Sequence, residues 1–304
     1  MIVAATVAAA LAWMPLPAAA VPRSEVAAAR VGGSIYVAGG FTPGGRTSAT
    51  VERYEIRGRR WQRVRPMPVA LNHPAAVAHR GRLYVSGGYA ASAGLAGASR
   101  VLLRYDSGRR RWRRLPPAPT PRAAHAAAVI GGRLYVAGGA NESGSLRSLE
   151  IYDFARRRWS SGPDLPGPAR NHTTGVASGG LFYVLAGRDA QNYAAAERYD
   201  PGRRRWQALP DMRTPRGGIA SVRLRDGRIV VFGGEELGAG GRTIAAVELF
   251  DPRTRRWSRL PDMRTPRHGV GGVALGSRVF ALKGGRVPGL SASPTIEFLD
   301  VPPR

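Results

Sequence analysis

The sequence predicts an all-β protein built from repeated antiparallel units of four short strands. Residues 121–166 show the pattern most clearly, with apolar or β-prone runs at 123–130, 134–136 and 149–153 and a last run around Trp159. Glycine pairs, a polar loop and prolines separate these runs, and none is long enough for a helix of ordinary length. The same order of runs recurs along the chain. One such unit cannot bury its apolar faces alone, so the units must pack against one another.

Three sequence markers recur in a fixed order with a period of about 50 residues. The first is a glycine pair: Gly39-Gly40, Gly87-Gly88, Gly138-Gly139, Ala186-Gly187, Gly233-Gly234 and Gly284-Gly285. The second is an aromatic-acidic pair: Tyr54-Glu55, Tyr105-Asp106, Tyr152-Asp153, Tyr199-Asp200 and Phe250-Asp251. The third is a tryptophan. This pattern resembles the kelch repeat, in which each unit is one four-stranded blade of a β-propeller. The resemblance covers nearly the whole chain and implies a propeller of six blades.

The first tryptophan belongs to the repeat. Trp13 precedes Gly39 by the same interval as Trp61 precedes Gly87, whereas the last unit ends at Arg304 without a tryptophan strand. The sequence therefore predicts that a strand at residues 14–16 completes the sixth blade beside residues 295–301, which closes the ring and removes an exposed edge. The predicted role of the tryptophans is to fill the wedge between neighbouring blades: Trp13, Trp61, Trp112, Trp159, Trp206 and Trp257.

The start of the chain is apolar and rich in alanine. Residues 2–11 resemble the hydrophobic part of a secretory signal, and residues 1–12 are shorter than the roughly 20 apolar residues of a membrane-spanning helix. We interpret residues 1–12 as a truncated signal sequence and residues 13–304 as a single propeller domain. A secreted, periplasmic or cell-surface location is expected, without a transmembrane anchor.

Composition limits the chemistry of this chain. It contains no cysteine, which excludes disulfides, a thiol nucleophile and the Tyr-Cys cross-link that copper oxidases similar to kelch proteins need. Motifs typical of serine hydrolases, histidine metal sites and phosphate loops do not occur. We therefore predict no catalytic residue, no cofactor and no metal site. The formal net charge is +26, and Lys283 is the only lysine, so almost all of the positive charge is arginine.

Arginines gather where the first and third turns of each unit are expected to share one end of the propeller. A ring of them would attract polyanions in a salt-dependent way, although a biased composition could equally have filled solvated turns with arginine. Aromatic residues do not interleave them, so specific nucleic-acid binding is not expected. The candidate polyanion residues are Arg59, Arg60, Arg109, Arg110, Arg111, Arg156, Arg157, Arg158, Arg203, Arg204, Arg205, Arg255 and Arg256.

Polar residues also recur at the other end, where each unit begins its innermost strand. Such residues would converge on the mouth of the central channel, the default position for a ligand site, unless each one bonds to a neighbouring loop instead. The candidate ligand-binding residues are Arg23, Asn72, His73, Arg122, His125, Arg170, Asn171, His172, Arg216, Arg267 and His268, with Glu235 and Glu236 from middle loops.

These observations predict a binding or interaction module, exported from the cell, for an anionic or carbohydrate ligand at the channel mouth. Its expected partner is a protein or a glycan, including a polyanionic cell-surface polymer, and the chain is expected to be a monomer. The alternative is an enzyme acting on an acidic sugar, similar to sialic-acid mutarotases. In that case Glu235 or Glu236 would act together with Arg216 or Arg188.

Overall fold

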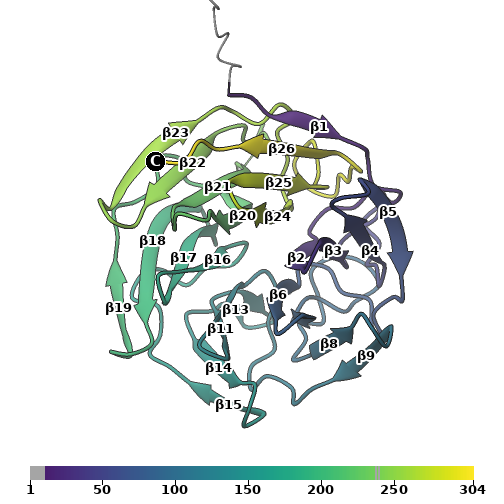
Figure 1. Ribbon diagram of the computed structural model, residues 1–304. Helices are drawn as coiled ribbons and strands as arrows, with labels where there is room; N and C mark the ends of the chain where they lie inside the picture. The colour runs from purple at the N-terminus through teal and green to yellow at the C-terminus, as the bar shows by residue number, and fades with distance from the viewer. Residues whose placement is uncertain (1–10, 237, 239) are drawn as a thin grey trace, which may run out of the picture.

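The computed structural model describes residues 11–236, 238 and 240–304, and it forms a ring of six four-stranded antiparallel sheets around a central channel (Figure 1). No helix occurs among the described residues, so none there could span a membrane. The first three blades are β2 (Ala27–Val31), β3 (Ser34–Ala38), β4 (Val51–Glu55) and β5 (Arg60–Val64); β6 (Ala75–His79), β7 (Arg82–Ser86), β8 (Leu102–Asp106) and β9 (Arg111–Arg114); and β10 (Ala126–Ile130), β11 (Arg133–Ala137), β14 (Leu149–Asp153) and β15 (Arg158–Ser161).

The other three blades follow the same order. They are β16 (Thr174–Ser178), β17 (Leu181–Arg188), β18 (Asn192–Asp200) and β19 (Arg205–Ala208); β20 (Gly217–Arg223), β21 (Ile229–Glu235), β22 (Val247–Asp251) and β23 (Arg256–Leu260); and β24 (Gly271–Leu275), β25 (Arg278–Leu282), β26 (Ile296–Asp300) and β1 (Met14–Leu16). A small hairpin, β12 (Ala140–Asn141) and β13 (Gly144–Ser145), extends from the third blade.

The innermost strand of each blade lines the channel. These strands, β2, β6, β10, β16, β20 and β24, contact one another in a closed cycle and consist largely of alanine, glycine, valine and threonine. Small residues are required there because six strands converge near one axis: a Cβ on Gly175 would lie only 2.6 Å from the backbone nitrogen of Ala127 in the neighbouring blade.

The N-terminal strand closes the ring, as the sequence predicts. β1 pairs antiparallel with β26 in the register Met14 to Phe298 and Leu16 to Ile296, and it lies at the outer edge of the sixth blade (Figure 1). Trp13 is buried in the apolar cluster between the fifth and sixth blades, and its ring lies 5.7 Å from that of Phe232. Both ends of the chain therefore contribute to one blade. The proposed signal sequence falls mostly on residues 1–10, outside the described residues.

Each tryptophan also joins its blade to the preceding one. In every blade the indole Nε1 donates a hydrogen bond to a backbone carbonyl just after the outer strand of the preceding blade, at distances of 2.7–3.1 Å. The Trp13 bond to Pro261 and the Trp61 bond to Pro17 carry this series across the point of closure. We call these six bonds the tryptophan links.

The glycine pairs mark the end of the second strand, where that strand passes close to the start of the blade. A Cβ on Gly40 would lie 2.3 Å from the carbonyl oxygen of Ser24. In the sixth blade the equivalent pair is Lys283-Gly284, one residue earlier than the sequence suggests, because Gly284 bonds to Arg23 as Gly40 bonds to Leu71. Lys283 is fully buried at φ 59°, and its Nζ donates to Glu52 of the first blade at 2.6 Å.

Candidate functional site

The five arginines expected at the channel mouth lie inside the blades. Each guanidinium group is almost fully buried and is paired with a buried glutamate on the third strand of its own blade, so it is not available to a ligand in the channel. Loss of hydration on burial lowers the pKa of Arg267 to about 10, although the negative charge of Glu297 beside it acts in the opposite direction. The pairs are Arg23–Glu52, Arg122–Glu150, Arg170–Glu197, Arg216–Glu248 and Arg267–Glu297.

The residues that do surround the channel axis stand two positions after these arginines or, in the second blade, two positions after Leu71. All six have positive φ, between 48° and 73°, and backbone hydrogen bonds of 2.8–3.0 Å connect most of them from blade to blade. We call them the axial ring: Glu25, His73, Ala124, His172, Gly218 and Gly269. Four are not glycine. A left-handed conformation costs such residues of order 1–3 kcal/mol and is enriched at functional sites.

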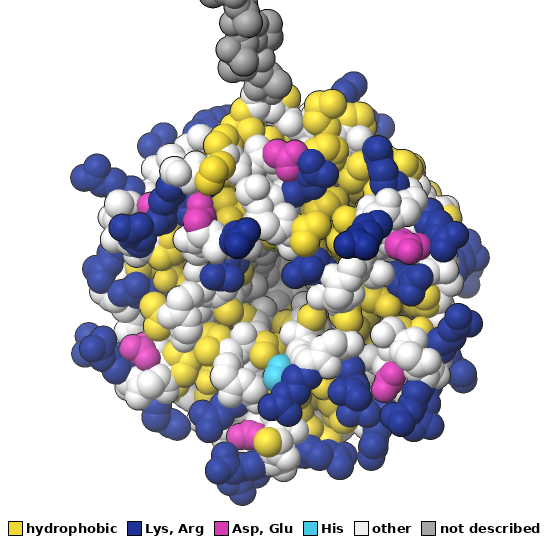
Figure 2. Space-filling model, viewed as in Figure 1, with side chains coloured by type: hydrophobic (Ala, Val, Ile, Leu, Met, Phe, Trp, Pro, Cys, Tyr) yellow, Lys and Arg dark blue, Asp and Glu magenta, His cyan; other side chains and the backbone are white. Residues whose placement is uncertain are grey.

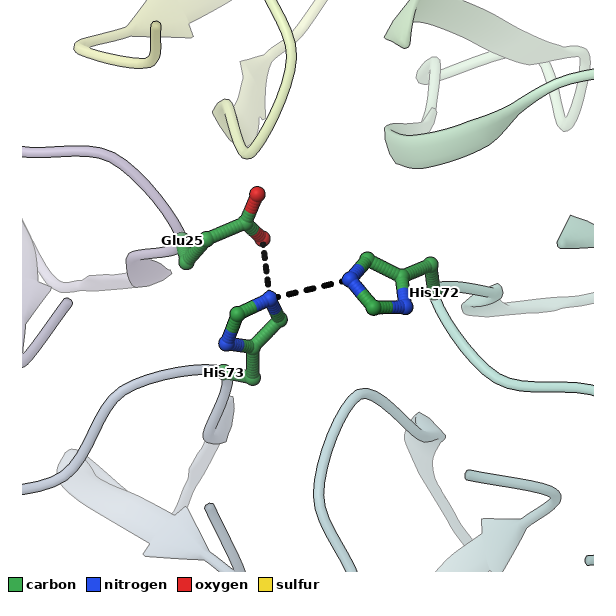
Figure 3. A group of neighbouring side chains, drawn as sticks. All are labelled: Glu25, His73 and His172. Carbon is green, nitrogen blue, oxygen red and sulfur yellow. Dashed lines mark hydrogen bonds and ion pairs between the residues drawn. The ribbon is translucent and has the colours of Figure 1, made fainter. Parts of the chain in front are cut away.

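Three side chains of the axial ring point toward one another across the channel (Figure 3). The Nε2 atoms of His73 and His172 are 3.0 Å apart, and a carboxylate oxygen of Glu25 lies 3.1 Å from Nε2 of His73. All three side chains are at least nine-tenths buried. They come from blades one, two and four, so the fold brings together residues that are far apart in the sequence.

A second set of polar groups contacts this cluster through Glu25. His268 donates from Nδ1 to the other oxygen of Glu25 at 3.0 Å and lies 3.6 Å from Glu235. Glu235 in turn accepts from Arg188 at 2.6 Å. Two of the groups named by the enzyme alternative therefore pair with each other, whereas Arg216 is buried against Glu248. Glu236 is partly exposed and pairs with Arg242 at 3.2 Å.

The charges in the cluster follow from this geometry. Burial would raise the pKa of Glu25, but the histidines around it, His73 first, hold it well below its usual range. Burial lowers the pKa of His73 and depresses that of His172 more strongly. Burial also disfavours the charged form of His268, but the contact with Glu25 outweighs it and raises that pKa. Glu25 is therefore an anion beside two histidines that burial keeps neutral.

Two cavities meet at the axial ring. A cavity of about 70 Å³ is lined by all six ring positions and by His125. A larger one of about 370 Å³ continues along the channel between the six innermost strands. The histidine–glutamate cluster thus borders a space large enough for an ion or a few waters, with the wider channel beyond it.

Several of the predicted mouth residues have supporting roles. Asn72 and Asn171 each contact Nδ1 of the histidine that follows them. His125 bonds through Nε2 to Ser86 at 3.0 Å. Glu25 is a site residue that the sequence reasoning missed, and its signal was its place two residues after Arg23, the place that His172 occupies after Arg170.

The predicted polyanion residues are all exposed on the third turns, and Lys and Arg side chains surround the molecule in Figure 2. We call the surface formed by these third turns the turn face. In each of the five turns one arginine has a positive φ of 49–54°. Its conformation is one that glycine or asparagine adopts with less strain. These arginines are Arg59, Arg110, Arg157, Arg204 and Arg255.

His125 should make stability depend on pH. Burial, and then the charge of Arg122, lower its pKa to about 3, whereas an imidazole in the unfolded chain titrates near 6.5. The unfolded chain therefore takes up this proton first, and the free energy of unfolding falls as the pH drops from about 6.5 toward 3. The expected loss from this group is about 2–3 kcal/mol by pH 4.5.

Denaturant unfolding of wild type and His125→Gln at pH 7.5 and 4.5 measures this effect. The variant should lose less stability between the two pH values, and His79→Gln, at a half-buried position, serves as the control. Equal losses in wild type and His125→Gln would contradict the assignment.

Comparison with known families agrees with the six-blade architecture. The family model described as KLHDC2/KLHL20/DRC7 Kelch-repeats domain matches residues 25–234, and the Kelch motif matches residues 220–264. The solved structure of YjhT superposes with a TM-score of 0.79 at 17% identity, covering 93% of this chain and 96% of that one. At that identity the superposition shows the fold alone.

Curated relatives with kelch repeats match part of the chain. Kelch repeat and BTB domain-containing protein 1 of camelpox virus is 30% identical over 121 residues, which is 40% of this chain and 21% of the viral protein. Human Kelch-like protein 34 is 35% identical over 127 residues, which is 41% of this chain and 20% of the human protein. The matched segment thus spans about a fifth of each relative's length.

Proposed function

Because the chain belongs to the kelch-repeat family, whose propellers typically serve as interaction modules, we propose that it binds an anionic polymer through its turn face. The partner chemistry is a chain of phosphate, sulfate or carboxylate groups, as in an acidic glycan of a cell surface. A net charge of +26 supports long-range attraction of such a chain.

The main support for this proposal comes from the five third-turn arginines that have a positive φ. Glycine would fit each of these five turn positions with less strain, and the fold leaves all five arginine side chains exposed at equivalent places around the ring. Since the turns repeat at nearly constant spacing, a flexible anionic chain could contact several of them at once. Each added contact would raise affinity by releasing counterions.

The channel mouth is less suited to the anionic ligand that the sequence suggested. Its buried arginines are held by glutamates, and Arg188 of the fourth blade is paired with Glu235. The polar groups that face the small cavity at this end include Glu25 and two histidines that burial keeps neutral, His73 and His172. An acidic sugar would meet a carboxylate there, so the geometry gives no support to the enzyme alternative.

Heparin is a suitable probe, and its affinity should fall steeply with salt. The variant Arg110→Gly/Arg157→Gly/Arg204→Gly removes three positively charged side chains and should not reduce stability. It should weaken heparin binding and reduce the slope of log affinity against log salt by about 2–3. Isothermal titration at several NaCl concentrations measures both quantities.

The matched control removes three positive charges from exposed middle loops at the opposite rim, as Arg46→Ser/Arg242→Ser/Arg286→Ser. Its slope should stay close to that of wild type. If both triple variants lose the same affinity, net charge alone explains the binding and the turn face has no special role.

Export is part of the proposal, because an extracellular chain would meet acidic surface polymers. The apolar, alanine-rich residues 2–11 support it. Fractionation of cells that express the full chain with a C-terminal tag would test this, and recovery from the cytosol alone would contradict it.

A further inference from the structure

We propose that Glu25, His73 and His172 bind one divalent transition-metal ion at the narrow end of the channel. Three ligand atoms, two imidazole nitrogens and one carboxylate oxygen, lie within 4.8 Å of one another. Their close separations of 3.0 and 3.1 Å approach the roughly 3.3 Å between ligands of a tetrahedral ion bound at about 2.0–2.1 Å. This site is separate from the turn face and does not depend on the proposed function.

Hydrogen bonds around the cluster determine which nitrogen of His172 carries a proton. Asp189 can only accept, so the Ser145 hydroxyl donates to it at 2.7 Å. Ser145 must then accept from the amide nitrogen of Asn171, also at 2.7 Å. The amide oxygen of Asn171 therefore faces Nδ1 of His172, which must donate the proton.

The same reasoning applies to His73. The carbonyl of Gly94 can only accept, so the amide nitrogen of Asn72 donates to it at 3.3 Å, and the same nitrogen lies 2.8 Å from the Thr47 hydroxyl. The oxygen of Asn72 then accepts from Nδ1 of His73 at 2.7 Å. Both histidines thus use Nδ1 as a donor, and in the neutral form each has a bare Nε2 that points at the other.

A bound cation would relieve the repulsion between the lone pairs that face one another in these tautomers. With both rings neutral, two nitrogen lone pairs and a carboxylate oxygen converge with no proton between them, in a buried place where an unsatisfied polar group is costly. A divalent ion would accept all three lone pairs, and the asparagines would hold the two rings in place as second-shell groups typically do.

The donor set selects the class of ion. Two imidazoles and one carboxylate suit Zn²⁺ and neighbouring transition metals, whereas Ca²⁺ and Mg²⁺ prefer oxygen ligands. His268 occupies one oxygen of Glu25, which leaves the other for the ion. The adjoining cavity of about 70 Å³ has room for a water as the remaining ligand.

The test is zinc binding by the full chain after treatment with a chelator. We expect one zinc per chain by elemental analysis after dialysis, and a cobalt-substituted protein with the visible absorption of a tetrahedral site. His73→Gln and His172→Gln should each reduce affinity at least 100-fold. His79→Gln, which alters a histidine on the turn side of the second blade, should leave both signals unchanged.

His268→Gln tests the positioning of Glu25. It should lower affinity about 10- to 100-fold while the stoichiometry stays at one. A wild-type chain that binds no more zinc than the His73→Gln/His172→Gln double variant would overturn the proposal, as would binding that His79→Gln abolishes. If the variants do not fold, the wild type still decides: less than a tenth of an equivalent at micromolar zinc means that a proton on His73, and not a metal, bridges the cluster.

Discussion

Removing residues 1–17 should lower the melting temperature by roughly 10 °C and promote aggregation. This truncation removes Trp13, whose loss from a packed interior costs about 3–5 kcal/mol, and each kcal/mol corresponds to a few degrees in a protein of this size. It also removes β1 and leaves the backbone of β26 unpaired along an exposed edge. Thermal unfolding followed by circular dichroism, with light scattering to detect aggregates, measures both effects.

The control is a shorter truncation, of residues 1–10 only. Cutting after residue 12, as the sequence suggests for a signal, would also remove Leu11, which packs against the cluster around Trp13. The 1–10 truncation should melt within about 2 °C of the full chain. Equal melting temperatures for the two truncations would show that β1 does not support the ring.

Breaking one buried arginine–glutamate pair should cost about 3–5 kcal/mol, whereas replacing both partners should cost much less. The chain itself contains the double replacement: in the second blade Leu71 and Leu103 stand where the other blades have arginine and glutamate, and both are fully buried. Arg267→Leu leaves Glu297 buried and unpaired. Arg267→Leu/Glu297→Leu copies the second blade and should stay within about 1–2 kcal/mol of wild type.

Denaturant unfolding of wild type, both single variants and the double variant completes a double-mutant cycle, which isolates the coupling between Arg267 and Glu297. A coupling energy near zero would contradict the interpretation that these pairs are mutually dependent.

The number of blades and the closure of the ring followed from the sequence because the tryptophan makes the same hydrogen bond to the preceding blade in every blade. Its spacing therefore counts blades, and Trp13 could be assigned before any strand was known. The direction in which the repeated arginine side chains point could not be predicted in this way. Recurrence shows that a residue matters in each unit, but it does not say whether the side chain points to the axis or into the blade. The joint replacement by Leu71 and Leu103 was the sequence signal for the second possibility.

The histidine–glutamate cluster was harder to foresee. Sequence motifs for metal sites rely on ligands close together on one element, whereas His73 and His172 are 99 residues apart. They meet only because the ring places the same position of different blades around one axis. Glu25 differs in residue type from the other members, so a search for repeated residue types passes over it. The positive φ of these positions appears only in the structure.

The tryptophan links imply that the two chain ends could be moved to another blade without loss of the fold. Every blade makes the same bond to its predecessor, including the one assembled from both termini. A circular permutant that joins Arg304 to Leu11 by a short linker and opens the chain between two other blades would keep all six links. Such a ring has no first or last unit to fray, unlike an open solenoid, so it should unfold in a single cooperative transition wherever its ends lie.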